Sequence, residues 1–184
     1  MTATLSIRDR QAPLKAGYQA NPSTACQITR VFSTTTGDDP MRIQIGTEAG
    51  DNARWNAAAH PAVGGYEDTP CSGDLLIASY AACQEITLRL VAVAMGIELE
   101  KVELTVEGEW DARGTLGIDR EVPVGYTRIH TTIKVVSDAP QEQVKKLLDR
   151  YERYCVVGAT LRNPPEITSS YAIEPAGAGS RSSE

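Results

Sequence analysis

The chain has 184 residues, of which 41% are apolar and 23% are charged, and its formal net charge is −6. This length is enough for one ordinary globular core, so we expect a single domain. The negative charge argues against nucleic acid or an anionic membrane as the main partner, because both attract basic surfaces. The first 20 residues contain no continuous apolar stretch, so we expect neither a secretory signal nor a membrane anchor there and predict a cytoplasmic protein.

The first quarter of the chain predicts an extension followed by a hairpin. Residues 1–25 have weak periodicity, and we set them apart as an N-terminal extension that holds one short helix. The next residues, CQITRVF, are rich in β-branched side chains and end at TTTGDDP, after which MRIQI alternates apolar and polar residues. This pattern is typical of two paired strands. Residues 46–69 then have the composition of one long loop, which in a compact domain is usually functional or disordered.

A long central helix is predicted between Thr69-Pro70 and Gly96, since Pro favours the first turn of a helix and Gly its end. At 100° per residue, Cys83 lies at the centre of an apolar stripe. The stripe comprises Leu76, Ser79, Ile86, Thr87, Leu90 and Ala94. Further apolar residues lie outside it (Leu75, Leu88, Val91 and Met95). An apolar surface this wide predicts that a second copy of the chain covers part of it.

The second half of the chain predicts another hairpin, from strands at 101–110 and 127–136 with alternating inward residues. Asp138-Ala-Pro140 opens a further helix, with Asp138 or Ser137 as its cap, and Cys155 continues the apolar stripe of that helix. The segment EITSSYAI supplies a last strand, and residues 175–184 are predicted to be disordered. The order ββ-α-ββ-αα-β predicts an α+β domain over residues 26–174 with a mainly antiparallel sheet.

Four cysteines occur, at positions 26, 71, 83 and 155, which is too few for a disulfide scaffold. No Cys-x-x-Cys pair is present and His60 and His130 are the two histidines, so we expect no metal site and no bound cofactor. Cys83 and Cys155 lie on the apolar faces of two helices that one core would bring together. Such a dithiol can run a peroxidase cycle through a sulfenic acid and a disulfide. The alternative is that both thiols pack as inert small hydrophobes.

Two segments resemble a known family. HPAVGGYEDTPCSGDLLIASYAACQEITLRL is similar to the signature helix of the OsmC/Ohr family, and YCVVGATL resembles its second-cysteine motif. The resemblance implies an intertwined homodimer with long central helices packed between sheets. It also implies reduction of small organic hydroperoxides, with Cys83 as the peroxidatic and Cys155 as the resolving thiol, and with an external dithiol as reductant.

The resemblance also implies an arginine that activates the thiolate and an acid that orients this arginine. Arg54, in the long loop, is the best candidate, and Arg42 and Arg30 are poorer because strands fix their direction. The position expected for the acid holds Gly73, and the neighbouring Asp74 is better placed to cap the helix. The second motif departs too, since Cys155-Val-Val-Gly stands where the family has Cys-Pro-x-Ser.

The remaining candidates carry weaker patterns. Cys26 is expected to pack in a strand, and Cys71 lies at the helix start, where the helix dipole favours a thiolate. Glu85 lies about 200° around the helix from Cys83, which favours a surface or dimer-contact role. His60 and His130 are expected in a loop and on a strand surface. A rival function stays open: an OsmC-type fold without peroxidase activity that binds a small apolar or electrophilic molecule or senses redox state.

Overall fold

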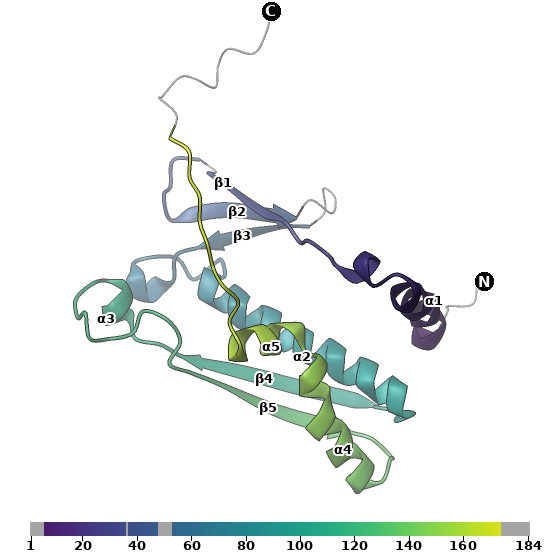
Figure 1. The fold of residues 1–184 in the computed structure, drawn as a ribbon. Coiled ribbons are helices and arrows are strands. Elements are labelled where there is room, and N and C mark those ends of the chain that lie inside the picture. Colours follow the sequence, from purple (N-terminus) through teal and green to yellow (C-terminus); the bar gives the residue numbers. More distant parts are fainter. Residues whose placement is uncertain (1–5, 36, 48–52, 174–184) are drawn as a thin grey trace, which may run out of the picture.

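The computed structural model describes residues 6–35, 37–47 and 53–173 of the chain. Figure 1 shows a long helix, α2 (Ser72–Met95), between two antiparallel sheets. One sheet has the order β1-β2-β3, from Val31–Thr35, Arg42–Thr47 and Arg54–Ala58. The other pairs β4 (Lys101–Glu109) with β5 (Arg128–Val136). The predicted α+β class, the central helix and both hairpins are therefore present.

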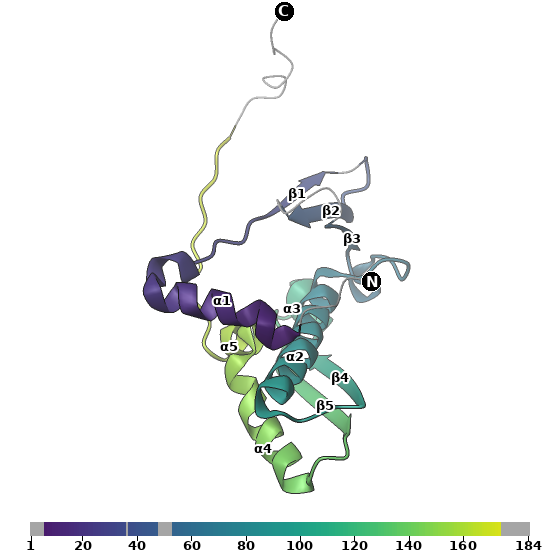
Figure 2. The same cartoon turned by 90° about the vertical axis from the view of Figure 1, so that its right-hand side faces the viewer.

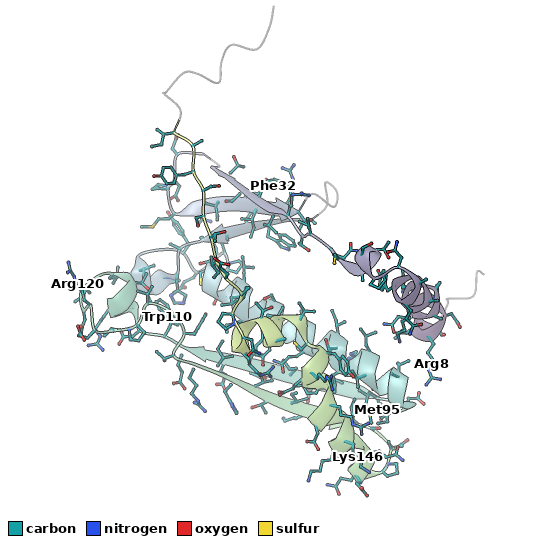
Figure 3. The ribbon with its side chains drawn as sticks, viewed as in Figure 1. Arg8, Phe32, Met95, Trp110, Arg120 and Lys146 are labelled. Carbon is teal, nitrogen blue, oxygen red and sulfur yellow. The ribbon has the colours of Figure 1, made fainter. Side chains whose placement is uncertain are left out.

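Shorter helices complete the fold. They are α1 (Ile7–Ala20), the 3-10 turns η1 (Pro22–Ala25) and η2 (Pro61–Val63), α3 (Ala112–Thr115), α4 (Gln141–Tyr151), η3 (Glu152–Tyr154) and α5 (Val156–Arg162). The elements packed against α2 include β4, α4, α5, η3 and α1. Figure 2 shows α1 crossing α2 on the side away from β4 and β5. Arg8 of α1 donates to the carbonyls of Val93 and Ala94 at the end of α2 that carries Met95 (Figure 3).

Both ends of α2 follow from local sequence. Cys71 is the N-cap: its sulfur accepts the N–H of Asp74, whose carboxylate accepts the N–H of Cys71 in return. Gly96 ends the helix in the left-handed region, at φ 72°. The capping role expected for Asp74 is therefore confirmed. The cap predicted for the later helix is wrong: Pro140 occupies that position without a side-chain bond, and Ser137 donates instead to the carbonyl of Glu98.

The core lies between α2, α4 and the β4–β5 sheet. Its buried members are Leu88, Ala92, Ile97, Val102, Leu147 and Tyr151. The buried line of α2 runs through Gln84, Leu88 and Ala92. The prediction that Cys83 lies at the centre of this stripe is wrong, because the sheet and α4 cover the neighbouring face; Cys83 lies at its edge and Ile86 is 60% exposed.

A buried polar network fixes α2 against its neighbours. Gln84 is 1% exposed, accepts the Tyr151 hydroxyl at 2.8 Å and donates to the Thr131 hydroxyl at 3.0 Å. These bonds tie α2 to α4 and to β5. Within the described residues, α2 is long and apolar enough to cross a membrane by length and composition alone, a test that the central helix of a protein core also passes.

Three predicted elements differ from those in the structure. Strand β1 begins at Val31, so Cys26 lies outside it and is exposed, and no strand among the described residues pairs with residues 26–30. The predicted loop 46–69 contains β3 and η2. The composition suggested a loop here, but the alanines at 57 and 58 are buried and β3 pairs with β2. The segment EITSSYAI forms no strand in the described residues up to 173, since no other strand pairs with it. Residues 175–184, predicted to be disordered, lie outside the described residues.

We expect Leu147→Ala to lower the free energy of unfolding by about 2–5 kcal/mol, because this side chain is fully buried and its loss leaves a cavity. Leu116→Ala removes the same atoms from a side chain that is 50% exposed and should cost less than about 1 kcal/mol. Urea unfolding of both variants at one protein concentration measures the difference. Equal losses would contradict the placement of the core.

Candidate active site

Cys83 lies on the third turn of α2, where α5 approaches that helix. The donors around its sulfur that act on its pKa are the backbone N–H groups of Val157 and Val156, at the start of α5, the Cys155 thiol and the Thr87 hydroxyl. The side chain is half-buried. The local sequence explains these positions: Thr87 is one helical turn after Cys83, and Val156 and Val157 are the first residues of α5, whose N–H groups have no acceptor within the helix.

Cys155 lies between η3 and α5 and is 1% exposed. It is the N-cap of α5, and its sulfur accepts the N–H of Gly158 at 3.3 Å. The predicted continuation of the preceding helix through Cys155 is therefore interrupted, since the residue adopts an extended backbone with ψ 105°. Cys155 nevertheless faces the interior, as the apolar stripe of that helix predicts, and its sulfur is buried.

The two thiols meet: the Cys155 S–H donates to the Cys83 sulfur. Burial raises the pKa of Cys83, but the bonds from Val157, Cys155, Thr87 and Val156 outweigh burial, so this pKa lies below its usual value. Burial also raises the pKa of Cys155, and its bond to Cys83 and the repulsion from a Cys83 thiolate add to that rise. Of the two thiols, Cys83 is therefore the one that ionises more readily.

A cation, Arg162, lies on the Cys155 side of the pair. Its charge lowers the pKa of Cys155 in opposition to burial, and its Nη2 atom donates to Glu152 at 2.6 Å. Together with Tyr80, Gly158 and Arg128, it lines a cavity of about 290 Å³. The sequence analysis missed Arg162, although it follows Cys155 by seven residues, which is two helical turns and places both on one face.

The arginines proposed from the sequence lie elsewhere. Arg54 is on β3, exposed, and donates to Gln44 of β2 at 3.2 Å. Arg42 is on β2, pairs with Asp68 at 3.0 Å and stacks over a tyrosine ring, while Arg30 precedes β1 and is exposed. The β1–β3 sheet that holds Arg54 and Arg42 is not among the main elements packed on α2 in the described residues. A single chain therefore does not bring Arg54 to the thiols.

Gly73, at the position expected for an acid, leaves room for an aromatic side chain. A Cβ at residue 73 would lie 2.7 Å from the Tyr126 hydroxyl, and one at Gly108 would lie 2.5 Å from the same ring. Tyr126 therefore fills the space between the start of α2 and β4. Glu85 pairs with Arg89 at 2.8 Å on the surface of α2, in agreement with the expected surface role.

Cys71 is buried at the start of α2 and lines a cavity of about 500 Å³. His60 lines the same cavity and packs edge-to-face on Trp110 at 5.2 Å between ring centroids. His130 is exposed on β5, as expected. Across residues 6–35, 37–47 and 53–173, no three or more His, Cys, Asp or Glu side chains gather in a group that could hold a metal ion.

The comparisons with known proteins agree with this architecture. A family model described as OsmC-like protein matches residues 65–170, more than half of the chain. The chain belongs to the OsmC-like family. The match includes α2, both hairpin strands that follow it and the Cys155 turn, so the two thiols of this OsmC-like chain lie within the matched residues.

Several solved structures have a similar fold. An OsmC-like protein from Mycoplasma pneumoniae is 19% identical with a TM-score of 0.60, and the match covers 75% of this chain and 89% of that chain. An organic hydroperoxide resistance protein OsmC from Legionella pneumophila is 21% identical with a TM-score of 0.55, over 74% and 90%. One from Elizabethkingia anophelis is 15% identical with a TM-score of 0.58, over 76% and 91%. No curated protein sequence matches this OsmC-like chain.

Alkylation of the reduced protein tests the difference in pKa between Cys83 and Cys155. We expect iodoacetamide to modify Cys83 at lower pH than Cys155, and Cys155→Ala to move the Cys83 profile to higher pH, because the substitution removes a hydrogen bond to the thiolate. Cys71→Ser should leave the Cys83 profile unchanged, since position 71 lies three turns earlier on the helix. Peptide mapping across pH measures each profile. An unchanged profile in Cys155→Ala would contradict the hydrogen bond.

Proposed function

We propose that this OsmC-like protein is a thiol-dependent peroxidase that reduces organic hydroperoxides to alcohols. The observation that carries the proposal is the proximity of Cys83 to Cys155, with the pKa of Cys83 lowered and that of Cys155 raised. Peroxidatic cysteines need a lowered pKa and a second thiol within reach. Two proteins of similar fold are named organic hydroperoxide resistance proteins, which agrees with this reaction class.

The cycle follows from the positions of the two sulfurs. The Cys83 thiolate attacks one peroxide oxygen, the O–O bond breaks, and the alkoxide takes up a proton and leaves as the alcohol. Cys83 is then a sulfenic acid. The Cys155 sulfur attacks the Cys83 sulfur, the S–S bond forms, and the hydroxyl leaves as water with the Cys155 proton. An external dithiol reduces this disulfide, becomes a disulfide itself and restores both thiols.

The proposal requires no metal or organic cofactor, because the oxidant is the substrate and the electrons come from the dithiol. It places the protein in the cytoplasm, where such reductants are abundant. We propose neither a nucleic acid nor a membrane as a partner. Arg54 remains the proposed activating arginine from the family resemblance, and a second chain would have to bring it to the Cys83 sulfur.

A second candidate function is the binding of a small apolar or electrophilic molecule. The observation that favours it is the cavity of about 500 Å³ at the start of α2, lined by aromatic and aliphatic side chains that include Trp110, Tyr126 and Leu76. Apolar cavities of this size are typical ligand sites. If this second function is the correct one, the purified protein should lose no free thiols when an organic peroxide is added.

Peptide mapping after one equivalent of cumene hydroperoxide tests the peroxidase cycle. We expect a Cys83–Cys155 disulfide in the wild type and a loss of turnover of at least about 100-fold in Cys83→Ser, which lacks the nucleophile. In Cys155→Ser the sulfenic acid should persist and oxidise further to the sulfinic acid. Cys26→Ser changes an exposed thiol and serves as the control. A disulfide between Cys71 and Cys83, or wild-type turnover in Cys155→Ser with a dithiol donor, would remove Cys155 from the resolving role.

We further propose that the protein is a homodimer, because one chain leaves apolar surface uncovered. Val31, Ile43 and Trp55 share one face of the β1–β3 sheet by strand register, and each is more than a third exposed. Ile86 of α2 is 60% exposed, and the extended C-terminal segment exposes Ile167, Tyr171 and Ile173. Unpaired strands and large apolar patches of this kind favour association.

Light scattering at micromolar protein concentration tests the assembly. We expect a mass of about twice the 19.8 kDa of one chain, since burial of the exposed sheet face and of α2 stabilises the dimer. Trp55→Glu places a charge in that face and should lower the mass toward that of one chain. Lys146→Glu, at an exposed position of α4, should leave the mass unchanged. A wild-type mass near 19.8 kDa would overturn the proposal.

A further inference from the structure

Arg162 and Glu152 form an ion pair near Cys155. Glu152 is in η3 and Arg162 ends α5, so the two residues bracket the Cys155 turn. Glu152 accepts the Arg162 Nη2 atom at 2.6 Å. This bond fixes the guanidinium while its other terminal nitrogen, Nη1, faces Gly158.

Gly158 allows the close approach of the arginine. A Cβ at this position would lie 3.2 Å from Arg162 Nη1, 3.2 Å from Cys155 Sγ and 3.0 Å from the Tyr80 ring. The Nη1 atom and the Cys155 sulfur are therefore separated by at most twice that distance. At such a range a cation stabilises a thiolate.

We propose that Arg162, held by Glu152, is a positioning residue for Cys155 that speeds formation of the disulfide and not the attack of Cys83 on peroxide. This inference rests on the proposed peroxidase cycle. It gives Cys155 its own arginine and acid, separate from the arginine that the family resemblance implies for Cys83.

The timing follows from the charge of the pair. In the reduced protein a thiolate at Cys83 repels a second negative charge and accepts a hydrogen bond from the Cys155 thiol, so both effects keep Cys155 protonated. Once Cys83 is a sulfenic acid, that repulsion ends, whereas the Gly158 N–H and the Arg162 charge still favour ionisation of Cys155. Oxidation of Cys83 therefore activates Cys155 when a second nucleophile is required.

The surroundings of Cys155 allow a clean comparison. The titratable groups near it are Cys83 and Tyr80 on α2, Tyr151 and Glu152 before the turn, and Arg162 on α5. Arg128 of β5 lines the same cavity as Arg162 and also pairs with an acid, Glu109, at 2.7 Å. Arg128→Gln is thus a matched control, since it removes an equivalent charge that lines the same cavity and is not among the groups that shift the Cys155 pKa.

The first measurement follows Cys155 alone. In a Cys83→Ala background, where no thiolate opposes ionisation, the alkylation of Cys155 is mapped across pH. We expect Arg162→Gln to move the profile to higher pH and to slow alkylation near pH 7 on the order of tenfold. Arg162→Lys should keep most of the wild-type profile, and Arg128→Gln all of it. A profile unchanged by Arg162→Gln overturns the proposal.

The second measurement separates the two steps with cumene hydroperoxide, by rapid quenching and trapping of the sulfenic acid with dimedone. Arg162→Gln should form the sulfenic acid within about twofold of the wild-type rate and close the disulfide on the order of tenfold more slowly, with the slow step recovering at higher pH. Equal slowing of both steps, or of neither, overturns the proposal. If the wild type forms no sulfenic acid, the peroxidase function fails, and the alkylation profiles alone still decide the role of Arg162.

Discussion

The buried amide of Gln84 fixes the geometry on which the thiol pair depends. It is the residue after Cys83, and it bonds Tyr151 and Thr131. A slip of α2 against α4 by one residue would bury the amide without partners, which costs more than an apolar mismatch of the same size. Cys155 follows Tyr151 by four residues, so the bond that sets the helix register also sets the distance between the sulfurs. A residue with no chemistry of its own therefore positions the reactive pair.

The opposite pKa shifts of the two thiols then follow from their burial and their hydrogen-bond donors. Cys83 receives backbone N–H groups from Val156 and Val157 and the Thr87 hydroxyl, whereas Cys155 receives the N–H of Gly158. Cys155 is also the more deeply buried of the two, which raises its pKa, so burial and donors together make Cys83 the more acidic thiol. This assignment needs no cation near Cys83. It is built into the backbone at the start of α5, where the first N–H groups have no partner within the helix.

The sequence was sufficient to predict those elements that neighbouring residues in the chain determine. The caps of α2, the alternation in β4 and β5 and the helical spacing of Cys155 behind Tyr151 are all visible in a few residues. It failed where a polar residue is buried, as at Gln84, because a hydrophobic pattern assigns such residues to the surface. It failed for β3, whose alanines are held by pairing with β2, and for the segment 166–173, whose alternation specifies a strand only when another strand pairs with it. The spacing of Arg162 from Cys155 was visible, but the sequence shows no bond between Arg162 and Glu152.

Gly73 and Gly158, two positions that depart from the family motifs, have a common physical reason. Each glycine removes a side chain where another group must approach: the Tyr126 hydroxyl at the start of α2, and the Arg162 guanidinium beside Cys155. With Tyr126 in place and Asp74 occupied by the cap, the start of α2 has no free acid to orient an arginine from the β1–β3 sheet. The second-cysteine turn has both an arginine and an acid in contact. In this chain, then, the two glycines leave space for an aromatic side chain at the beginning of the central helix and for an arginine–acid pair beside the Cys155 sulfur.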